Sequence, residues 1–188
     1  RRSSCRMRCY NLFNAYCISQ YWQKRRLNML SETKVKWYLN QIQEEAEMYS
    51  GCKKVSVGAL IIPHNTKTYI FGFNRTLPKS CKEQGCKRIE LYGEDFKEHR
   101  LPSDCRAIHS EIDAIAMCAK YGFSTDRATI IITRYPCEAC ARAIVNAGIK
   151  YVYYGREQEI SEETKEIFNV ANIQVKHIKS WTHEDTTR

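Results

Sequence analysis

Two short motifs constrain the fold of this chain more than any other feature: His-Ser-Glu at 109–111 and Pro-Cys-Glu-Ala-Cys at 136–140. Each opens a pattern typical of a helix. Two cysteines three positions apart at a helix start lie on neighbouring turns of one face, and the unpaired amides there favour thiolate over thiol. With one imidazole they make a three-ligand zinc set that leaves a fourth position for water. The fold must therefore bring His109, Cys137 and Cys140 together.

The two residues after His109 have separate predicted roles. Glu111 lies two positions past the histidine, so on a helix its side chain points in a different direction. We predict that Glu111 is a general acid and base beside the metal, not a ligand. Ser110 lies between them, where its backbone amide could bond a substrate atom. A structural zinc site would need four protein ligands, and a lone Cys-x-x-Cys is equally typical of redox sites, but the upstream His-x-Glu favours the zinc-deaminase signature.

Composition is that of one globular domain. The chain has 188 residues, of which 43% are hydrophobic and 27% charged, enough for a buried core. Its ten cysteines would suggest disulfides in a small secreted protein, but this chain is larger and has metal-type spacings, so we expect a reducing cytoplasm. No apolar run approaches the roughly twenty residues of a membrane span, so no membrane partner is expected.

The net charge of +9 is concentrated at the N-terminus. Residues 1–30 hold seven of the thirty Lys and Arg residues and no acid, which leaves 23 basic against 21 acidic residues in 31–188. The nearly neutral body disfavours a polynucleotide partner, although a local basic patch stays open. We expect residues 1–30 to lie outside the core; their composition resembles a transit peptide, but we favour upstream sequence, with Met29 as a natural start. Residues 181–188 are expected to be a polar tail.

The spacing of apolar residues predicts an α/β fold in which helices and strands alternate. Helices are expected over 31–49, from about 107 to 121, from 137 to about 148 and over 162–169, and strands over 55–62, 67–73, 128–133, 151–154 and 173–178. A hairpin loop at 63–66 joins the first two strands. The later alternation implies right-handed crossovers and a largely parallel half-sheet with helices on both faces, so the two ligand-bearing helix starts can converge at the strand ends.

Residues 74–105 form a polar, irregular insertion, which is uncommon without internal order or a function. The insertion and the segment before the first strand hold four cysteines: Cys52, Cys81, Cys86 and Cys105. We predict that these thiols bind a second, structural zinc that staples the insertion, with His99 as a possible replacement for one of them. Scattered free thiols without a metal are the alternative.

These motifs, in an α-β-β-α-β-α-β-α-β order over about residues 31–180, resemble the cytidine deaminase superfamily, and most of all its deoxycytidylate (dCMP) deaminase branch. Three further features resemble that branch: Val-Gly-Ala at 57–59, Gly-Phe-Asn at 72–74 and Asn-Ala-Gly-Ile-Lys at 146–150. The resemblance implies a three-layer α/β/α sandwich with a mixed five-stranded sheet, a catalytic zinc and a homo-oligomer. The insertion is similar to that of bacterial and phage members in which extra residues bind a second zinc.

The resemblance also implies substrate-binding residues. The residue at Asn74 contacts the sugar hydroxyl in that family, and aromatic residues at positions like Tyr135 and Tyr154 line the base pocket. The sequence also departs from the motifs of this branch in two places. The branch usually has His-Ala-Glu-x-Asn-Ala, where this chain has Ser110 and Asp113 in place of the first alanine and the asparagine.

The second departure is at Arg75, which replaces the last glycine of a Gly-Tyr-Asn-Gly loop associated with regulation by nucleoside triphosphates. A bulky side chain resists the tight turn that glycine allows, which argues against control by dCTP and dTTP. Arg75 could contact phosphate instead.

The implied reaction is hydrolytic deamination of dCMP to dUMP and ammonia, which supplies dUMP for thymidylate synthesis. Zinc lowers the pKa of the water that attacks C4, and Glu111 moves protons to N3 and to the departing amine. The alternatives are a deaminase acting on dCTP, cytidine, tRNA or single-stranded DNA, and a non-catalytic binding module on the same fold. The neutral body favours the free nucleotide, and an intact Glu111 disfavours the silent module.

Overall fold

The computed structural model describes residues 30–76, 79–93, 105–157 and 161–182. The predicted N-terminal extension, apart from Leu30, lies outside these residues, as do 183–188 of the tail and the alternate zinc ligand His99. The elements are α2 (Glu32–Tyr49), β1 (Gly58–Ile62), β2 (Ile70–Phe73), α3 (Cys81–Gln84), α4 (Lys87–Tyr92), α5 (Ser110–Tyr121), β3 (Thr129–Arg134), α6 (Glu138–Asn146), β4 (Tyr151–Arg156), α7 (Glu162–Val170) and β5 (Gln174–His177).

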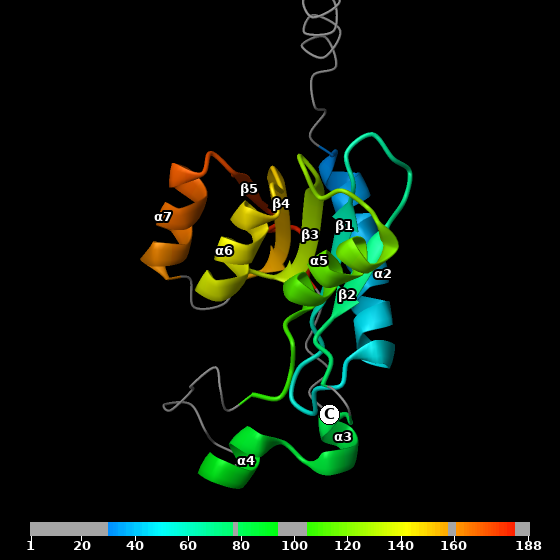
Figure 1. The fold of residues 1–188 in the computed structure, drawn as a ribbon, viewed down its shortest axis with the longest axis vertical. Helices are drawn as coiled ribbons and strands as arrows, with labels where there is room; N and C mark the ends of the chain where they lie inside the picture. Colours follow the sequence, from blue (N-terminus) through cyan, green and yellow to red (C-terminus); the bar gives the residue numbers. More distant parts are fainter. Residues whose placement is uncertain (1–29, 77–78, 94–104, 158–160, 183–188) are drawn as a thin grey trace, which may run out of the picture. The chain divides into compact units, whose positions relative to one another are not determined.

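The five strands form one mixed sheet in the order β2-β1-β3-β4-β5 (Figure 1). β1 is antiparallel to both β2 and β3, whereas β3, β4 and β5 are parallel to one another. Ala59 pairs with Gly72 on one side and with Ile132 on the other, and Ile132 pairs with Tyr154. The sheet confirms the predicted mixed five-stranded arrangement, including a hairpin between the first two strands and a parallel half after them.

Helices cover both faces of the sheet, with α2 on one side and α5, α6 and α7 on the other (Figure 1). Because side chains alternate between the faces of a strand, each buried strand contributes to both layers. Ala59, Ile130 and Ile132 belong to the core cluster that also contains residues of α5, α6 and α7. The intervening Leu60 and Ile131 are equally buried, at 1% and 0% exposure, and lie outside that cluster. The predicted three-layer α/β/α sandwich is therefore confirmed.

α2 forms where the sequence predicts it, and it is the helix that covers the second face of the sheet. Ser31 caps its start by accepting a hydrogen bond of 3.4 Å from the backbone N–H of Lys34. Its buried side recurs at helical spacing, at Val35, Tyr38, Leu39, Ile42, Gln43 and Ala46. The helix meets the sheet closely at Gly58, where an added Cβ would lie 2.5 Å from a methyl carbon of Ile42. None of the helices in the described ranges is long and apolar enough to cross a membrane.

The starts of β1 and α5 differ from the predictions because side-chain hydrogen bonds or an isolated bridge replace regular pairing there. β1 begins at Gly58 and not at 55, because the backbone just before it bonds to the side chain of Asn74. α5 begins at Ser110 and not near Ala107, because Ala107 pairs with Thr76 in an isolated antiparallel bridge. The insertion is more ordered than predicted: it contains α3 and α4, and Ser80 caps α3.

Candidate active site

The two predicted ligand helices begin near each other at one edge of the sheet. β3 ends at Arg134, and the chain then enters α6, whose N-cap residue is Cys137. His109 is the N-cap residue of α5, which packs against α6, β1 and β2. The carboxyl ends of the three parallel strands point to the edge at which α6 begins, which is where sites of open α/β sheets form.

The three predicted metal ligands meet at this edge. His109 Nδ1 lies 3.4 Å from the sulfur of Cys137 and 3.4 Å from the sulfur of Cys140. Around a tetrahedral zinc, with Zn–N of about 2.1 Å and Zn–S of about 2.3 Å, a nitrogen and a sulfur are about 3.6 Å apart. Within the part of the chain that the structure describes, this is the one group of three or more His, Cys, Asp or Glu residues whose ligand atoms all lie within 4.8 Å of one another. The donor set therefore fits zinc.

The two thiols are electrostatically unequal in the metal-free protein. The pKa of Cys137 falls to about 4, because Cys140 donates a hydrogen bond to its sulfur and His109 donates a second. The pKa of Cys140 is raised, because its proton is held in that bond and the side chain is buried. The hydrogen bond to Cys137 also raises the pKa of His109. One thiolate is therefore present at the site before a metal arrives.

Glu111 lies on the first turn of α5, two residues past His109, and is 5% exposed. Burial is the largest cause that raises the pKa of its carboxyl, against opposing hydrogen bonds and the charge of His109. The Ser110 hydroxyl donates a hydrogen bond of 3.1 Å to Glu111 Oε2, so Ser110 contacts Glu111 through its side chain. A buried carboxyl with a raised pKa and a fixed orientation is suited to take up and return a proton.

Asn74, a predicted substrate contact, follows β2 and is 7% exposed. Its Oδ1 accepts a hydrogen bond of 2.9 Å from the backbone N–H of Val57, and its Nδ2 donates one of 2.9 Å to the carbonyl of Val55. The side chain therefore fixes the backbone of the segment that precedes β1. Because β1 and β3 are antiparallel, this segment lies at the same end of the sheet as the carboxyl end of β3.

Tyr135 and Tyr154, the predicted base-pocket aromatics, lie in the core cluster with exposures of 5% and 7%. Their rings meet edge to face, with centroids 4.8 Å apart. The ring of His177 stacks on Tyr154, with centroids 4.6 Å apart and planes 4° from parallel. The sequence analysis did not single out His177, since it lies at the end of an apolar strand pattern with no motif around it.

Thr133 is a second residue that the sequence analysis missed. It is fully buried at the end of β3, and its hydroxyl accepts a hydrogen bond of 3.2 Å from Gly58 N–H and donates one of 3.4 Å to Gly58 C=O. These bonds join the start of β1 to the strand that leads into Cys137. The signal was available, because Thr133 places a hydroxyl directly after the three isoleucines at 130–132.

The four cysteines predicted to bind a second zinc approach one another without reaching ligand spacing. Cys81 is 3% exposed, and its pKa is raised first by burial and then by the neighbouring sulfurs of Cys86, Cys52 and Cys105. Among the residues that the structure describes, no three of these sulfurs lie within 4.8 Å of one another. The anchor of the cluster is Cys81, whose backbone N–H donates hydrogen bonds of 2.9 Å to Gly51 C=O and 3.0 Å to the Thr76 hydroxyl.

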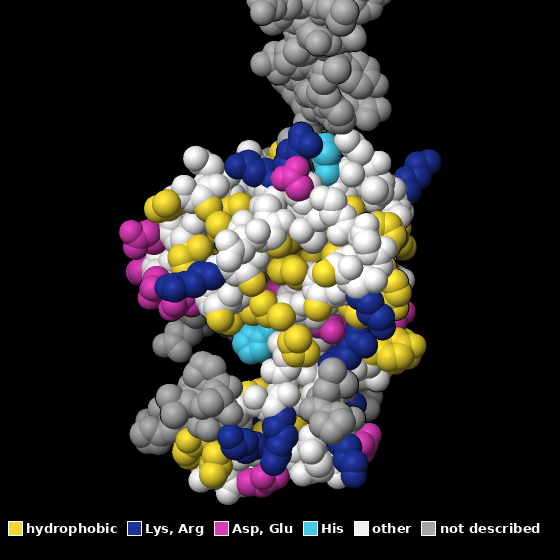
Figure 2. Space-filling view, in the orientation of Figure 1, with side chains coloured by type: hydrophobic (Ala, Val, Ile, Leu, Met, Phe, Trp, Pro, Cys, Tyr) yellow, Lys and Arg dark blue, Asp and Glu magenta, His cyan; other side chains and the backbone are white. Residues whose placement is uncertain are grey.

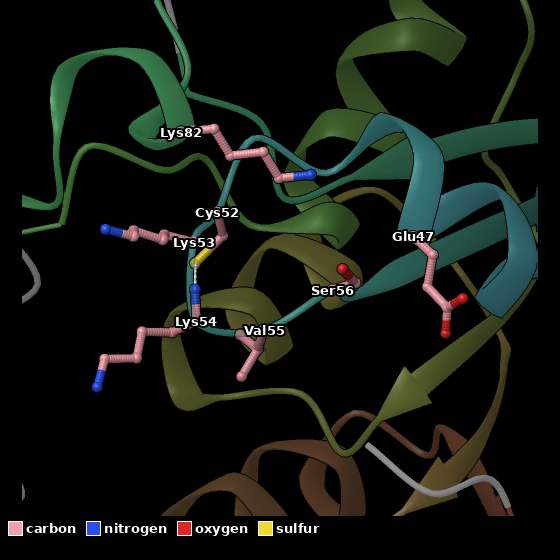
Figure 3. Close-up of a pocket in the computed structure, with 7 residues that line it drawn as sticks. All are labelled: Glu47, Cys52, Lys53, Lys54, Val55, Ser56 and Lys82. Carbon is pink, nitrogen blue, oxygen red and sulfur yellow. Dashed lines mark hydrogen bonds between the residues drawn. The ribbon is translucent and has the colours of Figure 1, made fainter. Parts of the chain in front are cut away.

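A hollow lies next to Cys52, one of these four cysteines (Figure 3). It is lined by Glu47, Cys52, Lys53, Lys54, Val55, Ser56 and Lys82. The ammonium group of Lys82, next to Cys81, points across the hollow, whereas those of Lys53 and Lys54 point away from it. Basic side chains also gather on the surface over α3 and α4 (Figure 2). The surroundings of Cys52 are therefore polar and include basic side chains.

The model of the MafB19-like deaminase family matches residues 33–185. ComE operon protein 2 of Bacillus subtilis (strain 168) is 33% identical over 132 residues, which are 69% of this chain and 64% of that protein. The deoxycytidylate deaminase of Enterobacteria phage T2 is 33% identical over 101 residues, which are 47% of this chain and 54% of that protein. The chain thus spans less than two thirds of the length of either relative.

A solved structure agrees with these matches. The dCMP deaminase from the cyanophage S-TIM5, in complex with dCMP and dUMP, is similar with a TM-score of 0.57 and 23% identity, over 80% of this chain and 99% of that one. At this identity the likeness shows the fold, which is the fold that the sequence predicts. Since the family model spans nearly the whole of the sheet and its helices, the chain belongs to the MafB19-like deaminase family, which confirms the predicted place in the cytidine deaminase superfamily and its dCMP deaminase branch.

Proposed function

We propose that the protein is a zinc-dependent deaminase that hydrolyses the amino group of dCMP to give dUMP and ammonia. The observation that carries the proposal is the convergence of His109, Cys137 and Cys140, with the buried carboxyl of Glu111 beside them and not among them. Three protein ligands are typical of catalytic zinc, whereas a structural site uses four. The same arrangement makes a silent binding module the weaker candidate, because such a module has no use for a buried carboxyl of raised pKa.

The chemistry divides between the ion and the carboxyl. When bound, zinc supplies the acidity that makes a water molecule nucleophilic at neutral pH. Glu111 takes the first proton of that water and delivers it to N3 of the ring as the oxygen bonds to C4. It then carries the second proton to the amine, so that ammonia leaves and the oxygen remains as the new carbonyl. Ser110 holds the carboxyl in one orientation through its hydrogen bond to Oε2.

A free nucleotide is the substrate class that we favour. The T2 phage relative is a deoxycytidylate deaminase, and the cyanophage enzyme of similar fold is a dCMP deaminase solved with dCMP and dUMP. The nearly neutral charge of residues 31–188 also favours a small nucleotide over a polynucleotide. Asn74, Tyr135 and Tyr154 are the residues that we propose for the sugar and the base.

The second zinc and the assembly are further parts of the proposal. The second zinc is supported by the three thiols close enough to Cys81 to raise its pKa, those of Cys86, Cys52 and Cys105. The seven described cysteines are free thiols, as a reducing cytoplasm would keep them. A homo-oligomer is supported by α2, on which Trp37 and Met48 are 57% and 64% exposed. Light scattering on the purified protein tests the assembly.

A panel of substrates tests the proposed activity. Equal concentrations of dCMP, dCTP, cytidine, single-stranded oligonucleotides and a tRNA are incubated with the zinc-loaded protein, and ammonia release is measured. We expect dCMP to be turned over fastest. The Glu111→Gln protein is the control for contaminating deaminase. A preference for an oligonucleotide or tRNA would replace the proposed substrate, and no release from any of them would remove the activity.

A further inference from the structure

Arg75 and Asp113 form an ion pair that joins the end of β2 to the first turn of α5. Arg75 Nε and one terminal guanidinium nitrogen lie 2.8 and 2.7 Å from the same carboxylate oxygen, Asp113 Oδ2. This oxygen also accepts a hydrogen bond of 2.9 Å from the backbone N–H of Phe73. The side chain of Asp113 is 13% exposed and that of Arg75 is 34% exposed. Three donors on one largely buried oxygen hold the helix turn against the strand.

The main chain of Arg75 holds the other end of the same turn. Its carbonyl accepts a hydrogen bond of 2.8 Å from the backbone N–H of Ile108, the residue before His109. Asp113, four residues after His109, donates its own N–H to the His109 carbonyl at 3.0 Å, which is the first bond of the helix. Arg75 therefore contacts the chain on both sides of the metal ligand, once through its backbone and once through its side chain.

Gly72 removes the remaining freedom of this turn. A Cβ added at Gly72 would lie 2.3 Å from the carbonyl oxygen of Ser110 and 2.3 Å from the backbone nitrogen of Ala114. The turn thus rests directly on the backbone of β2, and this contact fixes its distance from the sheet. The bonds from Arg75 fix its rotation about the helix axis.

We propose that Arg75 and Asp113 are a positioning pair that fixes the first turn of α5. The fixed turn orients the side chain of His109 toward the two thiols and that of Glu111 toward the reacting ring. The orientation of His109 toward the thiols is a feature of the structure, whereas the role of Glu111 rests on the proposed function. The two positions are also two of the three at which the sequence departs from the motifs of its branch, which usually has glycine and asparagine there. The side chains of these two residues contact each other in the folded protein. Either residue without the other would leave a charge without its partner.

Restoring the usual residues singly and together tests this pair. Arg75→Gly and Asp113→Asn are each expected to lower kcat about tenfold and to speed the loss of zinc to a chelator about tenfold, with KM nearly unchanged. The double variant is expected to show losses no larger than those of either single variant, because each single change already breaks the same pair. Arg75→Lys keeps the cation but loses a donor, so it should show the same effects more weakly even if Arg75→Gly folds poorly. Arg142→Gln, which breaks the pairs with Glu138 and Glu163 on α6 and α7, is the control and should change neither measurement.

The proposal would be overturned by single variants with the kcat and zinc retention of the unmodified protein, or by a double variant whose losses equal the product of the single ones. Loss of folding alone would lower the melting temperature without changing kcat per zinc-loaded molecule, and that result would also count against a positioning role. The zinc measurement does not need a substrate. If the unmodified protein deaminated none of the nucleotides, the proposed function would fail, while zinc retention would still decide whether the pair positions His109.

Discussion

The backbone N–H of Val57 donates a hydrogen bond of 2.9 Å to Oδ1 of Asn74. Asn74 Nδ2 also donates a hydrogen bond to the carbonyl of Val55. The side chain therefore holds the backbone of the segment before β1, and it is also a predicted contact for the sugar. The second N–H and a lone pair of the amide remain for a substrate hydroxyl. Asn74 can therefore have both roles, and its replacement should affect both.

Asn74→Ala should lower the free energy of unfolding by about 1–3 kcal/mol, because it leaves the buried backbone groups of Val55 and Val57 without partners. KM for the nucleotide should rise as well. Urea unfolding and steady-state kinetics measure the two effects. Asn169→Ala, at an exposed position of α7, is the matched control and should alter neither. Unchanged stability in Asn74→Ala would contradict the structural role of the side chain.

Glu111→Gln should fold and bind zinc as the unmodified protein does, but should lose turnover by about 10²–10⁴-fold, since the amide cannot carry a proton. Ammonia release and the zinc content of the same sample are the two measurements. Glu163→Gln, which alters an exposed ion pair with Arg142, serves as the control. Near-native turnover by Glu111→Gln would remove the acid–base role of this residue.

The metal-free protein should react with iodoacetamide at Cys137 before any buried cysteine. Because the pKa of Cys137 is lowered to about 4, this sulfur is a thiolate throughout pH 6–8 and its alkylation rate should hardly change there. Burial raises the pKa of Cys118, so its rate should stay low and rise with pH. Peptide mapping by mass spectrometry measures both, and added zinc should protect Cys137.

The lowered pKa of Cys137 also predicts how the stability of the metal-free protein changes with pH. The pKa of Cys137 is lower in the folded state than the ordinary thiol value, so its ionisation stabilises the metal-free fold at alkaline pH, above the unfolded pKa. That contribution declines as pH falls below the unfolded value and is lost when pH passes through about 4. An alkylation rate of Cys137 by iodoacetamide that rises tenfold per pH unit between pH 6 and 8 would contradict the lowered pKa of this thiol.

Pure protein should contain close to two zinc ions per chain. Cys81→Ser should lower the count to about one, because Cys81 is the buried centre of the second group of thiols. Cys118→Ala, which alters a buried cysteine on α5, should leave the count at two. Atomic absorption on dialysed protein measures the number. A count of one in the unmodified protein would remove the second zinc.

The sequence was enough to predict what depends on short spacing. His109, Cys137 and Cys140 were predicted from the three-residue step of the cysteines and the His-x-Glu motif, and the structure brings their ligand atoms together. α2 was predicted from its apolar stripe and from Ser31, and the structure shows that cap. In both cases neighbouring residues on one helix carry the information.

Contacts between distant positions could not be predicted in the same way. Arg75 and Asp113 are 38 positions apart, and no periodicity links them. The start of β1 was placed too early because Val55 and Val57 have the composition of a strand, while their bonds go to Asn74, 17 to 19 positions away. The insertion was predicted from its breakers to be irregular, and the short helices within it depend on a cap at Ser80 and on the bonds of Cys81 to Gly51 and Thr76.

His109 and Cys140 are separated by 31 positions, yet their ligand atoms are neighbours in the folded protein. In an unfolded chain these donors are scattered, so zinc binds the native state far more tightly than the denatured ensemble. Zinc at a hundred times its dissociation constant would add about 2.7 kcal/mol to the resistance against unfolding. The supply of this ion would then govern how much intact protein survives, in addition to how fast each molecule works.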